Sequence, residues 1–265
     1  MLQRARRIAE QAGAIALAGW RSGVTIEKKG AIDLLTKYDL AAERCIREGL
    51  ARAFPDHEVV GEEGEDQTTG ERPIWYVDPI DGTTNFAHGH PFFCVSMALW
   101  AEGAVQVGVV VAPALGVTWT SARGQGAKRN AVTQAEVTEE ACRVSTRARL
   151  EDALCATGFP YDRWTNPDDN LREHAAFLKR TRGIRRCGSA AIDLCLVAEG
   201  TYDIYWEQRL NPWDMCAGAL MIEEAGGTLS DYEGGAADPR SGKLVATNGL
   251  LHAATLELLR ETRSA

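Results

Sequence analysis

The stretch Trp75–Phe86 constrains the fold and chemistry of this chain most strongly, because an apolar run ends there abruptly in two aspartates, Asp78 and Asp81. Valine, isoleucine and aromatic residues favour a strand, and the Gly, Thr and Asn residues that follow predict a tight loop leading into a short helix. Gly82 permits a positive φ, and the three polar residues after it are candidates to cap that helix. Because a helix N-terminus favours an anion such as phosphate, the stretch predicts an anion site beside two carboxylates.

The same stretch offers three oxygen ligands to a hard cation such as Mg²⁺. They are the carboxylates of Asp78 and Asp81 and the backbone carbonyl of Ile80. A purely structural acidic turn is the commoner explanation for an isolated pair of aspartates at this spacing. The full octet DPIDGTTN is far more specific, and we therefore predict a metal site here.

Two further motifs flank the octet: GEE at 61–63, and Trp213 and Asp214 followed by EEAGG at 223–227. Together the three motifs resemble the inositol monophosphatase family of Mg²⁺-dependent phosphatases. The match runs from about Lys28 to Asn248 and covers most of the chain. It implies the layered αβαβα sugar-phosphatase fold of the α+β class. The resemblance also implies one domain over residues 1–265, with two fused halves that meet near residue 150 and a site between them.

The resemblance assigns roles to residues at matching positions. The implied metal ligands are Glu62, Asp78, the carbonyl of Ile80, Asp81 and Asp214. The implied catalytic residues are Asp39, Thr83 and Glu62, where Thr83 and Asp39 orient and deprotonate the attacking water and Glu62 bridges metal ions. The implied substrate contacts are Asp81, Gly82, Thr83, Gly188, Ser189, Ala190, Glu207 and Asp214.

Several of these residues also have a structural explanation, and the sequence alone leaves both interpretations open. Asp39 and Asp214 each look like an N-cap of the helix that follows. Glu207 can be a surface residue at the end of a strand. Lys28 matches a basic position near the outer metal and the phosphate, and it can equally be a solvated lysine.

Hydrophobic periodicity and turn residues predict the order of the elements. Helices are expected over residues 2–20, 39–53, 170–179, 191–198, 214–225 and 251–262. Strands are expected over residues 24–30, 58–61, 93–100, 104–112, 118–122, 201–207, 229–231 and 244–247, and the first strand of the second half within 151–160. The closely spaced strands between 93 and 122 imply an antiparallel meander, whereas residues 130–148 carry no chemistry that the sequence reveals.

Composition limits the partners and the compartment. The net charge of −8 argues against autonomous binding to nucleic acid or to an anionic membrane. The seven cysteines form no C-x-x-C pair, which favours reduced thiols in a cytoplasmic protein over a zinc site. No apolar run approaches the length of a membrane span, and the first helix is charged and amphipathic rather than a signal peptide.

The expected reaction is hydrolysis of a small phosphate monoester by direct attack of a water molecule that two or three Mg²⁺ ions activate, without a phosphoenzyme. The first-choice substrate is myo-inositol 1-phosphate, and the alternatives are histidinol phosphate, fructose 1,6-bisphosphate and a 3′-phosphonucleotide. Residues 87–90 read AHGH, where animal inositol phosphatases commonly carry an arginine, which weakens the substrate assignment. A function of another class stays open, namely a binding partner of the transcription or ribosome-assembly machinery. The resemblance also implies a homodimer.

Overall fold

The computed structural model describes residues 1–22, 27–28, 34–64, 66, 68–132 and 137–264. Its helices are α1 (Leu2–Ser22), α2 (Lys37–Ala53), α3 (Thr83–Ala87), α4 (Leu171–Leu178), α5 (Ala190–Ala198), α6 (Pro212–Glu224), α7 (His252–Ser264) and the 3₁₀ turn η1 (Leu150–Asp152). Its first strands are β1 (Glu27–Lys28), β2 (Leu34–Leu35), β3 (Glu58–Gly61), β4 (Ile74–Asp81), β5 (Cys94–Ala101), β6 (Ala104–Ala112) and β7 (Val117–Ala122). The remaining strands are β8 (Ala127–Val132), β9 (Val137–Ala141), β10 (Leu154–Thr157), β11 (Gly183–Arg185), β12 (Ile204–Gln208), β13 (Thr228–Ser230) and β14 (Lys243–Thr247).

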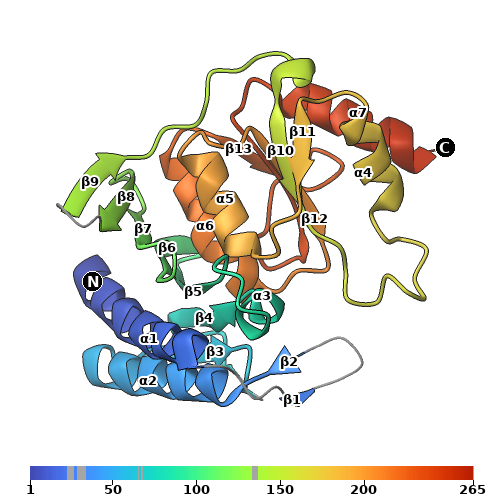
Figure 1. Cartoon of the computed structure of the whole chain (residues 1–265). Coiled ribbons are helices and arrows are strands. Elements are labelled where there is room, and N and C mark those ends of the chain that lie inside the picture. Colours follow the sequence, from blue (N-terminus) through green and yellow to red (C-terminus); the bar gives the residue numbers. More distant parts are fainter. Residues whose placement is uncertain (23–26, 29–33, 65, 67, 133–136, 265) are drawn as a thin grey trace.

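Helices and sheets alternate in layers across the molecule (Figure 1). Helices α1 and α2 cover one face of the larger sheet, and α5 and α6 lie between the larger and the smaller sheet. Helices α4 and α7 cover the outer face of the smaller sheet. This order of layers confirms the predicted αβαβα arrangement and the α+β class.

The larger sheet contains β4, the strand in which the acidic octet begins. Its order among the described strands is β3-β4-β5-β6-β7-β8-β9, in which β3 is parallel to β4 and the other pairs are antiparallel. The predicted meander is therefore confirmed. Every residue of β4 is buried, because helices cover both faces of the sheet at this strand. Residues 130–148 contain the end of β8 and all of β9, which no hydrophobic alternation had indicated.

The smaller sheet has the order β11-β10-β12-β14-β13. Strand β10 is parallel to both of its neighbours, whereas β14 is antiparallel to β12 and β13. The three-residue strand β11 lies at the edge, where the arginines of residues 182–186 reach solvent. Strand β11 is therefore a solvated edge strand.

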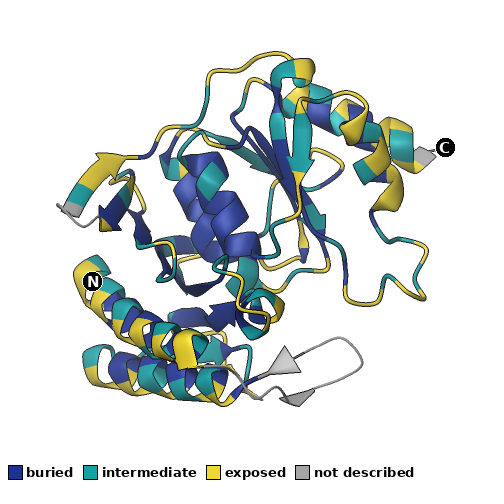
Figure 2. Ribbon diagram, in the orientation of Figure 1, coloured by how far each residue is buried: buried dark blue, intermediate teal, exposed yellow. Residues whose placement is uncertain are grey.

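Helices α5 and α6 form the centre of the core, and Figure 2 shows both of them buried between the sheets. Helices that are apolar all round are typical of such a position. One cluster of buried side chains includes Ala98 of β5 and Tyr205 of β12 together with Leu194 of α5 and Leu220 of α6. The two sheets therefore share a hydrophobic core through these helices.

Two predicted helix starts are wrong by two residues, and both errors have the same cause. Helix α2 begins at Lys37 with Thr36 as its N-cap, and the carboxylate of Asp39 accepts a hydrogen bond from the backbone N–H of Thr36 over 2.9 Å. Helix α6 begins at Pro212, and Asp214 accepts from the backbone N–H of Asn211 over 2.7 Å. Each aspartate is therefore the third helical residue reaching back to the cap, and not the cap itself.

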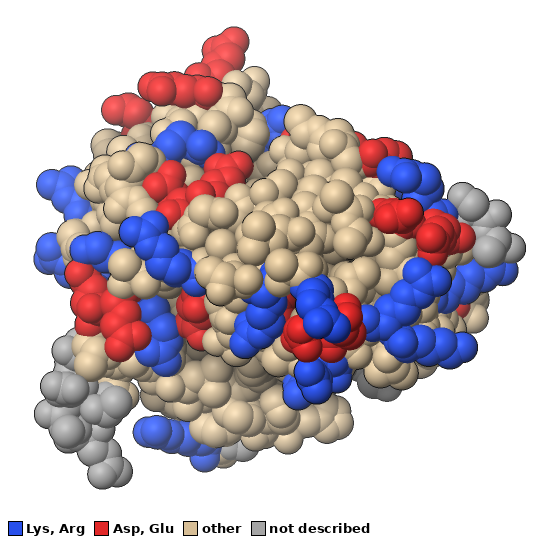
Figure 3. Space-filling view, turned by 90° about the horizontal axis from the view of Figure 1, so that it is seen from above, with Lys and Arg blue, Asp and Glu red and all other residues tan. Residues whose placement is uncertain are grey.

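Residues 23–26 and 29–33 lie outside the described part of the chain, so the strand predicted over 24–30 is described only for β1. The side chain of Lys28 also lies outside it. No helix within the described ranges is both long and apolar enough to cross a membrane. On the face of the molecule seen in Figure 3, acidic and basic side chains are interspersed over a largely uncharged surface.

Candidate active site

Three aspartates from two distant parts of the chain meet where the layers join. Asp78 and Asp81 lie in β4, and Asp214 lies in the first turn of α6. One carboxylate oxygen from each of them lies within 4.8 Å of the other two. Asp78 and Asp81 are buried, at 2% and 8% exposed. The fold thus places three carboxylates close enough together to share one cation.

Burial and mutual repulsion disfavour the charged form of these groups. Burial raises the pKa of Asp78 well above its ordinary value, and the charges of Glu62, Asp81 and Asp214 raise that pKa further. Burial likewise raises the pKa of Asp214 well above its ordinary value, with Asp81 as the next largest cause. A cluster of this kind is stabilised either by protons or by a cation.

The predicted ligand Glu62 lies in the same cavity, in the turn directly after β3. Its charge contributes to the raised pKa of both Asp78 and Asp214. It does not belong to the set of three carboxylates within 4.8 Å of one another. Glu62 therefore lies against the cluster, where its side chain is hydrogen-bonded to Asp78.

A cavity of about 510 Å³ surrounds the acidic cluster. It brings together all of the predicted site residues except Asp39: Glu62, Asp78, Ile80, Asp81, Gly82, Thr83, Gly188, Ser189, Ala190, Glu207 and Asp214. These residues come from both halves of the chain, as the resemblance implied. The cavity is also lined by residues to which the sequence analysis gave no role, among them Thr157, Gly158, Phe159, Tyr161 and Arg163.

Asp81 joins the two halves directly. Its Oδ2 atom accepts hydrogen bonds from the Ser189 hydroxyl over 2.6 Å and from the backbone N–H of Ala191 over 2.8 Å, at the start of α5. Burial raises the pKa of Asp81, and these two hydrogen bonds oppose that rise. The backbone amides around Ser189 were predicted to meet a substrate hydroxyl; the side-chain hydroxyl of Ser189 is engaged with Asp81, and the role of the amides stays a prediction. One Asp81 oxygen is therefore committed to the C-terminal half of the chain.

The predicted water-activating pair has separate partners. The Thr83 hydroxyl donates to the backbone carbonyl of Ile80 over 3.0 Å. Thr83 is the first residue of α3, and Gly82 at φ 90° is its N-cap, so the prediction that the polar residues after Gly82 cap this helix is wrong. Asp39 is fully buried in the capping box with Thr36. Joint action of Asp39 and Thr83 stays a prediction.

Glu207 lies against the smaller sheet with a defined set of neighbours. The Tyr205 hydroxyl donates to its Oε2 atom over 2.6 Å. A side chain on Gly158 would place Cβ only 2.0 Å from Glu207 Oε1, so glycine is required there. Burial raises the pKa of Glu207 to about 7. Glu207 is therefore a cavity residue and not the surface residue that strand position alone would suggest.

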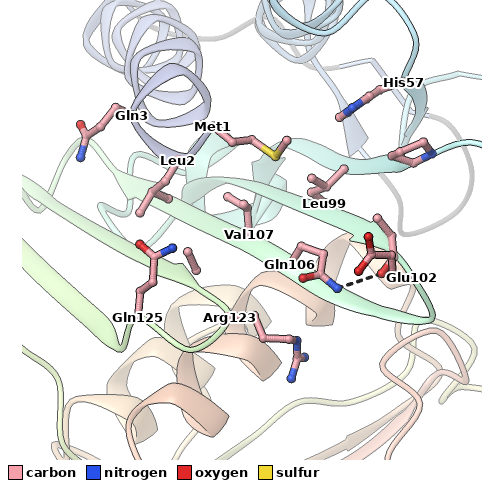
Figure 4. A pocket seen from close by; sticks show the side chains of 13 residues that line it. Met1, Leu2, Gln3, His57, Leu99, Glu102, Gln106, Val107, Arg123 and Gln125 are labelled. Carbon is pink, nitrogen blue, oxygen red and sulfur yellow. Dashed lines mark hydrogen bonds between the residues drawn. The ribbon is translucent and has the colours of Figure 1, made fainter.

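A second cavity, of about 630 Å³, lies at the N-terminal end of α1, between residues 1–3 and the hairpins of the larger sheet. Figure 4 shows Leu2, Leu99 and Val107 around it together with three glutamine side chains. Among the described residues that line it, Glu102 is the one carboxylate. It is larger than the acidic cavity, but it offers no convergent set of ligands and we do not assign the chemistry to it.

Comparison with known proteins matches the chain over nearly its whole length. The sequence profile of the Inositol monophosphatase family matches residues 1–264. The chain is 41% identical over 253 residues to the inositol-1-monophosphatase of Synechocystis sp., covering 95% of this chain and 85% of that protein. It is also 41% identical over 230 residues to Nus factor SuhB of Pseudomonas aeruginosa, covering 85% of this chain and 82% of that protein.

A solved structure supports the same comparison at the level of the fold. The inositol monophosphatase of Anabaena superimposes on this chain with a TM-score of 0.86 at 35% identity. The superposition covers 98% of this chain and 95% of the Anabaena chain. The layered arrangement is therefore shared over nearly the whole length of both proteins.

Proposed function

The chain belongs to the inositol monophosphatase family and is a phosphoric monoester hydrolase, and from this premise we propose that it hydrolyses a small phosphorylated polyol with the help of bound Mg²⁺. The observation that carries the proposal is the meeting of Asp78, Asp81 and Asp214 within 4.8 Å of one another. They line a cavity large enough for a small phosphate ester. Phosphoryl transfer requires mainly positioning and neutralisation of charge, and this arrangement suits that task.

The donor set fits a hard cation. Mg²⁺ prefers carboxylate, carbonyl and water oxygens. The three aspartates would hold it, with Glu62 and the carbonyl of Ile80 close by in the same cavity. Two or three ions are proposed, as the resemblance implies. When bound, Mg²⁺ supplies a Lewis acid for the phosphate ester and lowers the pKa of water.

In this proposal, residues of the chain orient the attacking water and accept its proton. Thr83 and Asp39 are proposed to orient the attacking water and to accept its proton. Asp81 holds the N-terminus of α5 against β4 through its bond to the Ser189 hydroxyl. The site thereby keeps a fixed spacing between the groups contributed by its two halves, which is what an in-line displacement requires.

The proposed first-choice substrate is myo-inositol 1-phosphate. Glu207 supports this choice because a carboxylate at the cavity wall accepts hydrogen bonds from ring hydroxyls. Histidinol phosphate, fructose 1,6-bisphosphate and 3′-phosphonucleotides are the proposed alternatives. One fold supports several such activities, so the choice depends on the residues that line the cavity.

The test is release of inorganic phosphate from a panel of these four esters, with Mg²⁺ and with excess chelator. We expect turnover of myo-inositol 1-phosphate that depends on Mg²⁺. Asp56→Asn is a suitable control, because it removes one carboxylate from an exposed turn outside the cavity. Full turnover in chelator, or no release from any ester with Mg²⁺, would contradict the proposed function.

One specific observation favours a second function, as a binding partner of the transcription machinery: a relative that is 41% identical carries the name Nus factor SuhB. The net charge of −8 and the interspersed charges in Figure 3 favour a protein partner over direct binding to nucleic acid. Co-purification of RNA polymerase or its factors with the protein in Mg²⁺-free buffer tests this function. Recovery of the protein alone would contradict it.

A cytoplasmic location and a homodimer are also proposed. All seven cysteines are free thiols, which suits a reducing compartment. The homodimer follows from the resemblance alone. Sedimentation of the purified protein at several concentrations measures the mass of the assembly and tests the dimer directly.

A further inference from the structure

Asp193 is a buried carboxyl group in the substrate cavity to which neither the sequence motifs nor the proposed reaction gives a role. It is the only charged residue in the nine residues of α5. Its side chain lines the acidic cavity, and the residue is 2% exposed. Its Oδ1 atom has no hydrogen-bond partner among the described residues. An unpaired buried carboxyl group costs stability, so its position in this wall needs an explanation.

The neighbours of Asp193 define one wall of the cavity. Burial raises the pKa of Asp193 well above its ordinary value, the charges of Glu207 of β12 and Asp81 of β4 raise it further, and the charge of Arg186 lowers it. The charge of Arg186 also lowers the pKa of Glu207. Asp193 and Glu207 therefore face a common space between α5 and β12.

Arg186 reaches this space from the loop before α5. It is exposed, and one guanidinium nitrogen lies 2.6 Å from the position that a Cβ on Gly188 would occupy. Gly188 has φ 87° and itself lines the cavity. The guanidinium thus lies close to the backbone at the cavity wall, whereas the two carboxyl groups lie deeper.

The hydrogen bonds already made distinguish the two carboxyl groups. Glu207 Oε2 accepts from the Tyr205 hydroxyl, so the orientation of Glu207 is fixed by the protein. Asp193 is held by its backbone, whose N–H donates to the carbonyl of Ser189 in the first turn of α5. Its Oδ1 atom is itself buried from solvent, so Oδ2 is the oxygen that is left to accept a donor from the contents of the cavity.

We propose that Asp193 is a specificity-determining residue that accepts a hydrogen bond from a hydroxyl group of the substrate alcohol, beside the hydroxyl that Glu207 accepts. This inference rests on the proposed phosphatase function. It adds a second residue that recognises the alcohol part of the substrate. It also narrows the substrate class to uncharged alcohols that carry hydroxyl groups at two neighbouring positions. A second phosphate at the same place would be repelled by the ionised form of Glu207.

The experiment compares two esters that share a six-membered ring, myo-inositol 1-phosphate and cyclohexyl phosphate, which lacks the ring hydroxyls. The variants are Asp193→Ala and Asp193→Asn, with Asp56→Asn as the control. The measured quantity is the ratio of kcat/KM for the two esters. Thermal midpoints in chelator are recorded for all proteins.

We expect the preference for the inositol ester to fall by roughly 3- to 10-fold in Asp193→Ala, as for a lost neutral hydrogen bond, because burial keeps the pKa of Asp193 well above its ordinary value. The Asp56→Asn control should keep the wild-type ratio. The thermal midpoint of Asp193→Ala should rise, because alanine favours the helix and removes an unpaired buried carboxyl group. A purely structural role for Asp193 predicts the opposite change in midpoint.

A ratio within about twofold of wild type in both Asp193 variants would overturn the inference. An active wild-type enzyme without any preference for the inositol ester would overturn it as well. If the wild-type protein hydrolyses other esters of the panel but neither of these two, the inference fails; if it hydrolyses no ester of the panel with Mg²⁺, the proposed function itself fails.

Discussion

The hydroxyl of Ser189 donates a hydrogen bond to Asp81 Oδ2 over 2.6 Å, although 108 residues separate the two along the chain. Asp81 is at the same time a member of the acidic cluster. Asp81 therefore accepts a hydrogen bond from the start of α5 with its Oδ2 atom. Its Oδ1 atom is left for a cation. The contact makes the geometry of the cluster depend on how the two halves are packed.

Asp81→Asn should lower kcat/KM with Mg²⁺ by at least about 100-fold. Changing a residue that only orients a metal ligand already lowers metal affinity or activity by roughly 10–100-fold, and Asp81 is proposed to be a ligand itself. The amide keeps the shape and an acceptor for Ser189, so the fold should survive. Phosphate release measured against Mg²⁺ concentration checks this prediction. Ser189→Ala is the matched comparison, which keeps the charge but should cost about 1 kcal/mol of stability through the lost cap.

The metal-free protein should lose stability as pH rises. Burial raises the pKa of Asp78 and of Asp214 above the ordinary value of 3.8. The folded state therefore binds protons more tightly than the unfolded state, and this contribution to stability is lost as pH rises through the folded pKa values. Since Mg²⁺ needs the ionised carboxylates, its stabilising effect should grow over the same range.

Thermal midpoints in chelator and in Mg²⁺, measured between about pH 5 and pH 8, check both trends. The difference between the two midpoints is expected to widen as pH increases. A difference that does not change with pH would argue that these carboxylates do not hold the cation.

Asp39→Asn and Thr83→Ala should each lower kcat by roughly 10²–10⁴, the usual range for a positioned proton acceptor. If the two residues act as one unit, the double variant should be little worse than either single variant. The structure supplies a control in Thr36→Ala, which removes the other side chain of the α2 capping box. Thr36→Ala should cost about 1 kcal/mol of stability and leave kcat largely intact.

Equal behaviour of Asp39→Asn and Thr36→Ala would assign Asp39 to capping alone. Steady-state kinetics and thermal unfolding of the four variants distinguish the two outcomes. Additive losses of stability with near-normal turnover would remove both Asp39 and Thr83 from the mechanism.

Glu207→Gln should lower kcat/KM for a polyol phosphate by about 1.5–3 kcal/mol and have little effect on an aryl phosphate. Gly158→Ala should act in the same direction, because the new Cβ would lie about 2.0 Å from Glu207 Oε1 and displace the carboxylate. Gly183→Ala is the control, since a Cβ there would have as its nearest neighbour one arginine nitrogen at 3.5 Å. Equal losses on both substrates would show that Glu207 is structural.

The same residue predicts a pH dependence of binding. With a pKa of about 7, Glu207 becomes ionised as pH rises through neutrality. Charge-assisted hydrogen bonds are stronger than neutral ones, so KM for a polyol phosphate should fall over this range relative to KM for an aryl phosphate. A constant ratio of the two KM values across neutral pH would contradict the assignment.

Several features of the site were predictable because they depend on local residue order. The octet places Asp78 and Asp81 at the end of a buried strand, and the WD motif places Asp214 in the first turn of a helix. The N-cap errors at Asp39 and Asp214 were avoidable, since Thr36 and Asn211 stand three residues earlier in a capping-box pattern.

Other features depend on packing and have no local sign. Strand β9 reads VTEEA, a polar edge strand whose register is set by its neighbour β8. Asp193 looks like the solvent-facing residue of an ordinary helix, and only the placement of α5 between two sheets buries it. The requirement for glycine at Gly158 comes from Glu207, which lies about fifty residues away in the sequence.

The distribution of the acidic ligands along the chain has a consequence for synthesis. A ribosome that has released β4 has produced Asp78 and Asp81, but Asp214 emerges only after more than one hundred further residues. A cation that needs all three carboxylates cannot be retained by the nascent N-terminal segment, whose two charges still repel each other in water. A cation that all three carboxylates hold would therefore be captured only after Asp214 has been made, and the free energy of its capture would stabilise a chain that already contains both parts of the cluster.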